Sequence, residues 1–293
     1  MAINITSDWH IHSTSSCDGH MAFKDLIKIM PEKGIVNFGV SDHLSTPKML
    51  IDLINSRMEF DAIKPSAGSL NFHFGIEASS ISKWELETML QKGLGDRNLG
   101  IRQGGPYDDE PAMFLTKELV DKYNIEYVLA GVHFALYVPL EREAVISSYH
   151  RQNMFLANNP LVTVIAHPWW FGDVNGYWAE PDGKMLTGPW FDDFAGAIPK
   201  SMHDEFASAV VQNNKIVEIN MVMILGPQWT ERFKSDYIDW LSFMKSRNVK
   251  FSIGSDCHGP DYSIDGYQIA IDLRKAERIL AGAGFTNADI WCL

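Results

Sequence analysis

Short runs of apolar and β-branched residues recur along the whole chain, and most of them end in a His, an Asp or a Glu. Each run has the length of a strand, and most are bounded by Gly, Pro or Ser, which is typical of a strand that ends at a turn. The pattern therefore predicts seven strands. They cover residues 2–12, 36–43, 70–77, 127–133, 161–167, 216–220 and 250–258.

Segments with a helical pattern lie between these runs. In residues 22–33, apolar side chains at Phe23, Leu26 and Met30 recur at helical spacing, and Gly34 supplies a C-terminal stop signal. Similar patterns predict helices over residues 111–123, 141–156, 201–213, 229–247 and 269–283. Strands and helices alternate along almost the whole chain, which predicts an α/β fold with parallel strands and crossover helices, either a barrel or a doubly wound sheet.

Two segments interrupt the alternation. Residues 93–110 are rich in Gly and in charge, and they are predicted to form a loop. Residues 169–199 hold four of the nine tryptophans and are long for a stretch without regular structure. We interpret them as an excursion from the barrel mouth inside a single domain of residues 1–293. The excursion is either a small core packed by the tryptophans or a substrate lid. The four tryptophans are Trp169, Trp170, Trp178 and Trp190.

Composition narrows the class of protein. The chain has 293 residues, of which 46% are hydrophobic and 21% charged, as in ordinary globular proteins. Its formal charge of −12, with no basic tail, argues against binding of long nucleic acid. Three cysteines are too few for a disulfide framework, and neither a signal peptide nor a membrane-spanning run is recognisable. We expect a cytoplasmic protein that does not associate with membranes.

Candidate chemistry is concentrated where strands end. His10 and His12 are two residues apart at the end of the first run, and Asp256 and His258 repeat this spacing at the end of the last run. Side chains at i and i+2 share one face of a strand, about 6.5–7 Å apart along the chain, so two such groups can converge on one metal ion. The first and last strands of a closed barrel are neighbours, so the two pairs would meet.

Four more strand ends carry a possible metal ligand. These ligands are His43, Glu77, His133 and His167. Parallel barrels build their active sites at the C-terminal ends of their strands. Desolvating so many ionisable groups at one rim would be prohibitive unless cations satisfied them. The pattern therefore predicts a metal site at the barrel mouth.

In their order and spacing, these motifs resemble those of the PHP (polymerase and histidinol phosphatase) superfamily of metal-dependent phosphoesterases. The resemblance runs from Asp8 to His258, through His-Ile-His-Ser at 10–13, Ser-Asp-His at 41–43, Gly-Ile-Glu at 75–77, Gly-Val-His at 131–133, Ala-His-Pro at 166–168 and Ser-Asp-Cys-His at 255–258. It implies a distorted (β/α)7 barrel, in agreement with the seven runs. It also implies a site for two or three divalent ions of zinc, manganese or iron. The implied ligands are His10, His12, Asp18, His43, Glu77, His133, His167, Asp256 and His258.

The resemblance further implies hydrolysis of a small phosphate monoester, such as histidinol phosphate or a nucleotide, by a metal-bridged hydroxide. Asp256 and His20 are candidates for protonating the leaving oxygen. Asn220 is a plausible substrate contact by resemblance, Arg102 lies in a segment that could reach the phosphate, and Trp169 begins a segment that could stack a base.

Other functions remain open at this stage. An amidohydrolase-like enzyme that cleaves C–N or C–O bonds would also use a His-x-His pair and a late Asp, but it commonly needs a carboxylated Lys, and no Lys stands at a predicted strand end. A nucleotide 3′-phosphatase or exonuclease would fit the metal ligands, although the acidic charge opposes long nucleic acid. A purely structural metal module would have no reason to keep an open rim of ligands.

Overall fold

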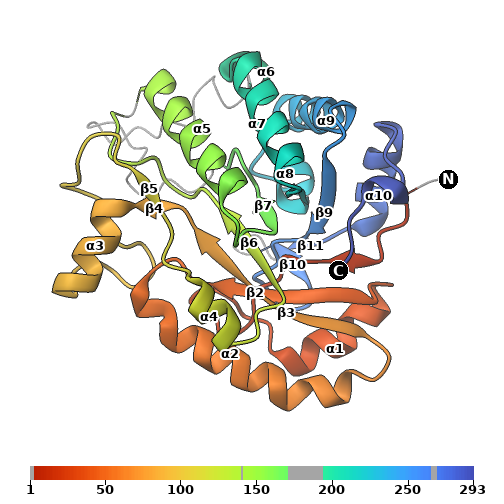
Figure 1. Cartoon of the computed structure of the whole chain (residues 1–293). Coiled ribbons are helices and arrows are strands. Elements are labelled where there is room, and N and C mark those ends of the chain that lie inside the picture. Colours follow the sequence, from red (N-terminus) through yellow and green to blue (C-terminus); the bar gives the residue numbers. More distant parts are fainter. Residues whose placement is uncertain (1–2, 140, 171–193, 265–268) are drawn as a thin grey trace.

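The computed structural model describes residues 3–139, 141–170, 194–264 and 269–293. Its centre is a parallel sheet of seven strands in the order β1-β2-β3-β6-β7-β8-β9 (Figure 1). One strand forms in each of the seven predicted runs. The strands are β1 (Ser7–Asp8), β2 (Asn37–His43), β3 (Asn71–Ser79), β6 (Tyr127–Gly131), β7 (Val164–Ala166), β8 (Ile216–Asn220) and β9 (Lys250–Gly254).

The sheet closes on itself through the residues that follow β1 and β9. The Trp9 N–H donates to the Ile253 carbonyl at 2.9 Å, and the Asp256 N–H donates to the His10 carbonyl at 2.8 Å. The His12 N–H donates to the Cys257 carbonyl at 2.9 Å. The result is a nearly closed barrel of parallel strands, so the predicted fold class is confirmed.

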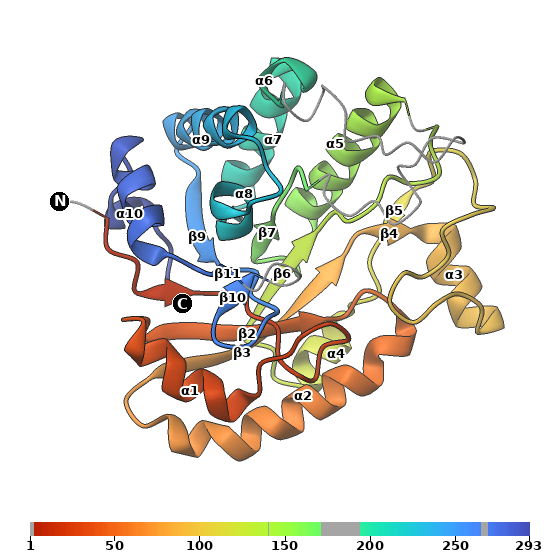
Figure 2. The same cartoon turned by 180° about the vertical axis from the view of Figure 1, so that it is seen from behind.

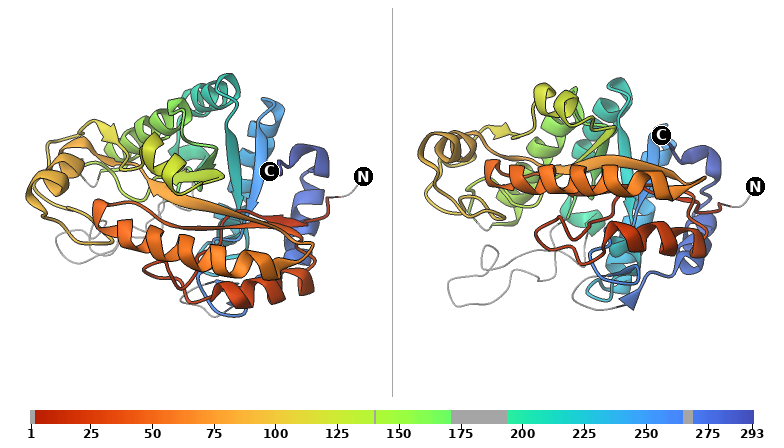
Figure 3. Two further views of the ribbon diagram at one scale, coloured as in Figure 1. Left: turned by 60° about the horizontal axis from the view of Figure 1, so that its bottom comes forward. Right: turned by 90° about the horizontal axis from the view of Figure 1, so that it is seen from below.

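Helices surround this barrel (Figures 1 and 2). They are α1 (Phe23–Glu32), α2 (Leu50–Ile63), α3 (Lys83–Lys92), α4 (Lys117–Lys122), α5 (Arg142–Asn158), α6 (Phe194–Ala197), α7 (Lys200–Gln212), α8 (Met221–Leu225), α9 (Glu231–Ser246) and α10 (Leu273–Gly282). Helices α1 and α2 lie side by side along β2 and β3 (Figure 3). Two antiparallel pairs are added, β4 (Ile81–Ser82) with β5 (Pro111–Ala112) and β10 (Ser263–Ile264) with β11 (Ile269–Ala270).

Several elements differ from the sequence-based expectation. The helix expected over residues 111–123 is confined to Lys117–Lys122, because Pro111–Ala112 pairs with β4 as a strand. The helix expected from residue 269 begins at Leu273, where the Asp272 carboxylate caps it by accepting from the Lys275 N–H at 2.9 Å. Helices α2 and α3 were not predicted, since each buries polar side chains among its apolar ones.

Apolar side chains fill the half of the barrel interior where the strands begin, and we call this cluster the apolar plug. Tyr127 and Leu129 of β6 point inward and pack with Trp9 and with Trp291 near the C-terminus. The Tyr127 hydroxyl donates to the carbonyls of Trp9 and Val40, both at 2.9 Å. The plug occupies the end of the barrel where the strands begin, so only the opposite end offers space for a polar site.

A second aromatic cluster packs outside the barrel, in the region where the sequence placed its tryptophan-rich excursion. Trp170 contacts Trp229, whose ring stacks on Phe233 at 4.3 Å. Trp240 donates from its indole N–H to His203 Nδ1 at 3.0 Å. A buried aromatic cluster is therefore present at the start of this segment. Residues 171–193, which include Trp178 and Trp190 and on which the choice between a small core and a lid depends, lie outside the described residues.

Close packing around Tyr127 generates a stability prediction. A Cβ on Gly75 would lie 2.4 Å from the Tyr127 ring, so Gly75→Ala should overpack the plug and destabilise the protein by about 1–3 kcal/mol. Gly282→Ala is the matched control, because a Cβ there meets nothing within 4 Å at an exposed helix end. Urea unfolding measures both variants. Equal stabilities of the two variants would contradict this account of the plug.

Candidate metal centre

All nine predicted ligands come together at the C-terminal ends of the strands. They form four overlapping groups in which each residue offers one ligand atom and these atoms lie within 4.8 Å of one another. The groups are His12/Asp18/His43/His258, His10/His167/Asp256, His10/His12/Glu77 and His43/Glu77/His133. Because residues are shared between groups, the site is one continuous cluster rather than four separate ones.

Glu77, at 0% exposure, is the centre of this cluster. Its Oε2 lies 2.8 Å from His43 Nδ1 and 3.3 Å from His10 Nε2. Its Oε1 lies 3.0 Å from His167 Nε2 and 3.3 Å from His133 Nε2. One carboxylate therefore faces imidazoles from opposite sides of the barrel, which suits a bridging position between two cations.

Asp18 and Asp256 complete the cluster at two other points. Asp18 Oδ2 lies 3.3 Å from His43 Nε2 and 3.6 Å from His258 Nε2, and its side chain is 44% exposed. Asp256 Oδ1 lies 3.3 Å from His10 Nε2 and 3.4 Å from His12 Nε2. Asp18 thus faces the solvent side of the cluster, and Asp256 faces the interior side.

The donor set fits divalent transition metals. His10 Nε2 and His12 Nε2 lie 3.0 Å apart, and both nitrogens face carboxylate oxygens. Glu77 Oε2 is buried, and its close polar neighbours among the described residues are imidazole nitrogens. Imidazole nitrogens mixed with carboxylate oxygens, with no Lys or Arg among the nine, are the ligands that zinc, manganese and iron accept. That these side chains bind metal remains a prediction.

Protonation in the cluster is strongly shifted. Burial, together with the nearby imidazoles of His258 and His43, lowers the pKa of His12 to about 3, so this ring is neutral at pH 7. Burial also opposes the charge of His10, but the carboxylates of Asp256, Glu218 and Glu77 outweigh it and hold the His10 pKa well above its usual value. The pKa of His43 is likewise raised: burial lowers it, and Glu77 and Asp18 overcome that effect.

Glu218 orients side chains of the cluster, a role that was not assigned to it from the sequence. It points into the barrel from β8, and its Oε1 lies 2.6 Å from His10 Nδ1. Its Oε2 accepts from the His167 N–H at 2.8 Å. A carboxylate on Nδ1 fixes the ring so that Nε2 faces the cluster. The sequence did hold a signal, because Glu218 shares the inward face with Asn220.

Ser79 gives similar support from β3. Its hydroxyl lies 2.9 Å from His133 Nδ1, which leaves Nε2 directed at Glu77. Side chains also alternate between the two faces of the neighbouring strand β2. His43 points into the cluster, whereas Asp42 points outward and accepts from the Ser13 hydroxyl at 2.7 Å.

The candidate substrate residues have different surroundings. Asn220 is fully buried, and its amide donates to Glu218 and to Asp256 Oδ2, both at 3.1 Å, so it holds ligands in place rather than facing a substrate. Trp169 is 0% exposed and packs against His203 in the aromatic cluster, which does not fit a substrate contact. His20 is exposed, and its N–H donates to the His258 carbonyl. Arg102 lines a pocket next to the cluster.

Comparison with known proteins bears on the fold. No protein-family model matches the chain, and no curated protein matches it. Its structure superposes on histidinol phosphate phosphatase from Lactococcus lactis, solved with zinc, L-histidinol and phosphate, with a TM-score of 0.59. The two sequences are 15% identical over 96% of this chain and 94% of that one. This chain has the fold of histidinol phosphate phosphatase.

This likeness in fold covers nearly the whole chain. The IolI protein, solved with a zinc atom, also aligns, with 11% identity, 97% of this chain and 87% of that one covered, and a TM-score of 0.42. Within the described residues, no helix is long and apolar enough to cross a membrane.

The contact between Glu218 and His10 yields a prediction about metal affinity. Glu218→Gln removes the charge that holds His10 Nδ1, so zinc affinity should fall by about 10- to 100-fold. Glu205→Gln is the matched control, because Glu205 makes a comparable carboxylate–imidazole contact to His150 at 2.9 Å outside the cluster. Competition with a chromophoric chelator measures both. Unchanged affinity in Glu218→Gln would refute the supporting role.

Protonation generates a second prediction. In the metal-free protein the raised pKa values of His10 and His43 keep both rings protonated at pH 7, so a metal must displace those protons. Zinc affinity should therefore rise with pH between 6 and 8 and fall as the pH is lowered. Calorimetry in buffers of different ionisation enthalpy should record proton release at pH 7. Binding without proton release would contradict the predicted charge state.

Proposed function

We propose that this chain is a metal-dependent hydrolase of a small phosphate monoester. The observation that carries the proposal is the buried Glu77 carboxylate, whose two oxygens lie within 3.3 Å of imidazoles from four strands at the mouth of a barrel. A cluster of this kind can hold adjacent cations, and pairs of adjacent cations catalyse phosphate ester hydrolysis in two-metal sites. The fold shared with histidinol phosphate phosphatase adds support.

The chain's own residues have distinct parts in this reaction. Metal ions in such a cluster activate a water molecule and neutralise charge on the phosphate oxygens. Glu77, with His10 and His43, would hold the ions at the buried side. Asp18, the most exposed of the carboxylates in the cluster, faces the side from which substrate arrives. Asn220 orients Asp256 by donating to its Oδ2.

Asp256 is better suited to bind a cation or accept a proton than to donate one. Burial raises its pKa, but His10, His12 and His258 together lower it well below the usual range, so the group is ionised at pH 7. His20 is the remaining candidate for protonating the leaving oxygen. Its backbone N–H bonds to the carbonyl of His258, which keeps residue 20 next to a cluster residue, although the residue itself lines a separate pocket with Pro260 and Asp261.

Two substrate classes compete with this proposal. An amidohydrolase commonly bridges its metals with a carboxylated Lys, whereas here Glu77 has the central position, and no Lys is among the described residues that line the pocket beside the cluster. A nucleotide substrate would need a large pocket for its base, and the pocket next to the cluster measures about 110 Å³. Both observations favour a small phosphate ester. Histidinol phosphate, whose alcohol half carries an ammonium group, is the member of that class to compare with uncharged alcohols.

Activity after metal reconstitution tests the proposal. Protein loaded with zinc, manganese or iron should hydrolyse p-nitrophenyl phosphate, and His10→Ala and Glu77→Gln should each lower turnover by roughly a thousandfold or more and reduce bound metal. Glu205→Gln should keep both. A panel of phosphate esters, amides and lactones identifies the bond. Hydrolysis of amides or lactones without hydrolysis of phosphate esters would refute the proposal.

A further inference from the structure

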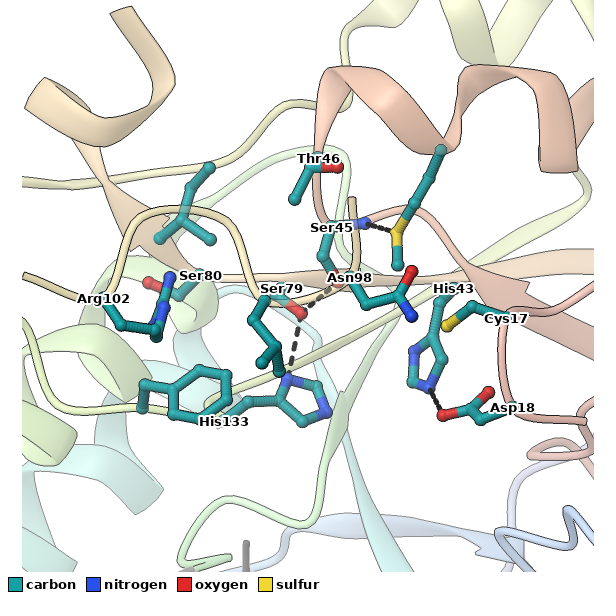
Figure 4. Close-up of a pocket in the computed structure, with 14 residues that line it drawn as sticks. Cys17, Asp18, His43, Ser45, Thr46, Ser79, Ser80, Asn98, Arg102 and His133 are labelled. Carbon is teal, nitrogen blue, oxygen red and sulfur yellow. Dashed lines mark hydrogen bonds and ion pairs between the residues drawn. The ribbon is translucent and has the colours of Figure 1, made fainter. Parts of the chain in front are cut away.

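A pocket opens directly beside the metal cluster and continues away from it. Its volume is about 110 Å³, and three cluster residues, Asp18, His43 and His133, form one side. The opposite side is formed by Ser80 and Arg102 (Figure 4). A phosphate held at the cluster would therefore direct its alcohol half toward these two residues. This inference rests on the proposed function.

The far wall is rigid. Residues 96–100 form a tight turn, in which the Asp96 carboxylate accepts from the N–H groups of Asn98 and Leu99 at 2.8 and 2.9 Å. Glu85 of α3 accepts from the Ile101 N–H at 2.7 Å and pairs with the Arg102 guanidinium. The turn that brings Asn98 to the pocket is thus fixed to a helix before any ligand arrives.

The wall presents polar groups that lack partners. Ser80 is 3% exposed, and its hydroxyl has no hydrogen-bond partner among the described residues. The same holds for Nε of Arg102. Ser79, by contrast, is engaged by Ser45 and by His133. Buried polar groups without partners are rare and point to an absent ligand that supplies them.

The charged side chain on this wall is Arg102, which is paired with Glu85 of α3. The Arg102 guanidinium lies 4.3 Å from the Phe134 ring centroid, stacked as a cation on an aromatic face. Asp18 is the one acidic side chain among the described residues that line the pocket, and it belongs to the metal cluster. Apart from Asp18, no carboxylate among the described residues of this lining is placed to neutralise an ammonium group, and Arg102 disfavours one.

We propose that this pocket, through Ser80, Asn98 and Arg102, binds the alcohol half of a small hydroxylated phosphate monoester, such as a polyol or sugar phosphate, and selects against leaving groups that carry an ammonium. Hydroxyl oxygens accept from Arg102 and from the Asn98 amide, and they exchange hydrogen bonds with Ser80. The volume lies below the ~300 Å³ of common ligand pockets, so the alcohol is small.

Three esters with the same three-carbon chain test the proposal. They are glycerol 3-phosphate, propyl phosphate and 3-aminopropyl phosphate. The kcat/KM for glycerol 3-phosphate should exceed both others by about tenfold or more, because a site built to bond hydroxyls discriminates against analogues that lack them. Hydroxylated butyl phosphonate should likewise inhibit more strongly than butyl phosphonate, which reports on binding without turnover.

Variants of the residues in the pocket wall test whether these residues cause the selectivity. Ser80→Ala and Asn98→Ala should each lower the preference for glycerol 3-phosphate over propyl phosphate about tenfold, with little effect on propyl phosphate itself. Arg102→Met leaves Glu85 buried without its cation, so the pair Arg102→Met/Glu85→Gln removes both charges together. That double variant should relieve discrimination against the aminopropyl ester. Ser246→Ala, an exposed hydroxyl on α9, is the control.

The outcomes separate this inference from the proposed function. If p-nitrophenyl phosphate is hydrolysed but the three esters react equally, or the aminopropyl ester reacts best, the pocket assignment is wrong and the phosphatase proposal stands. If the wall variants leave all ratios unchanged, the assignment is also wrong. If no phosphate ester is hydrolysed by the metal-loaded protein, the proposed function itself fails.

Discussion

Burial of charge at one end of the barrel is the constraint on which the rest of the structure depends. Glu77 loses its hydration inside the cluster, and carboxylates are not buried in this way without compensation. The imidazoles of His10, His43 and His133 outweigh this burial and hold the pKa of Glu77 well below its usual range. However, His12, His43 and His258 crowd one another, and protonating all three would add repulsion. Divalent cations resolve both problems at once, so metal binding should stabilise the folded state as well as create the site.

The surrounding structure holds this end open and ordered. The apolar plug of Trp9, Tyr127 and Trp291 fills the opposite end, so the polar side chains gather at one mouth. Two further buried carboxylates point away from the interior and fasten the segments that carry ligands. Asp8 accepts from the Ser255 N–H at 2.9 Å and from the Tyr262 hydroxyl, also at 2.9 Å.

Asp42 likewise fastens the segment after β1 through hydrogen bonds. It accepts from the Ser13 N–H at 2.6 Å and from the hydroxyl of Ser56 on α2. Burial raises the pKa of Asp42 and takes that of Asp8 to about 6, while the hydrogen bonds to both carboxylates favour the charged form. Ligand geometry in the cluster therefore depends on hydrogen bonds made on the outer face of the sheet.

Seven strands and the meeting of eight candidate ligands could be predicted because both follow from short-range rules: alternation along a strand, and the common edge of parallel strands. The ninth ligand, Asp18, was expected only from the resemblance to the PHP superfamily. The surroundings of Glu218, Asn220 and Trp169 could not, since each is set by contacts between segments far apart in the sequence. Glu218 meets His10 across 208 positions. No local pattern carries that information.

Helices α2 and α3, which the sequence pattern missed, show why such failures have a physical meaning. Asp52 on α2 and Glu85 on α3 are buried at 4% and 1% exposure, and these polar residues blur the apolar face by which a helix is recognised. The same carboxylates pair with Arg97 and Arg102 and so fix the loop that forms the pocket wall. A helix that packed only through apolar side chains would have been easy to predict and could not have held that loop. Local rules are broken here where the chain builds the wall of its candidate substrate pocket.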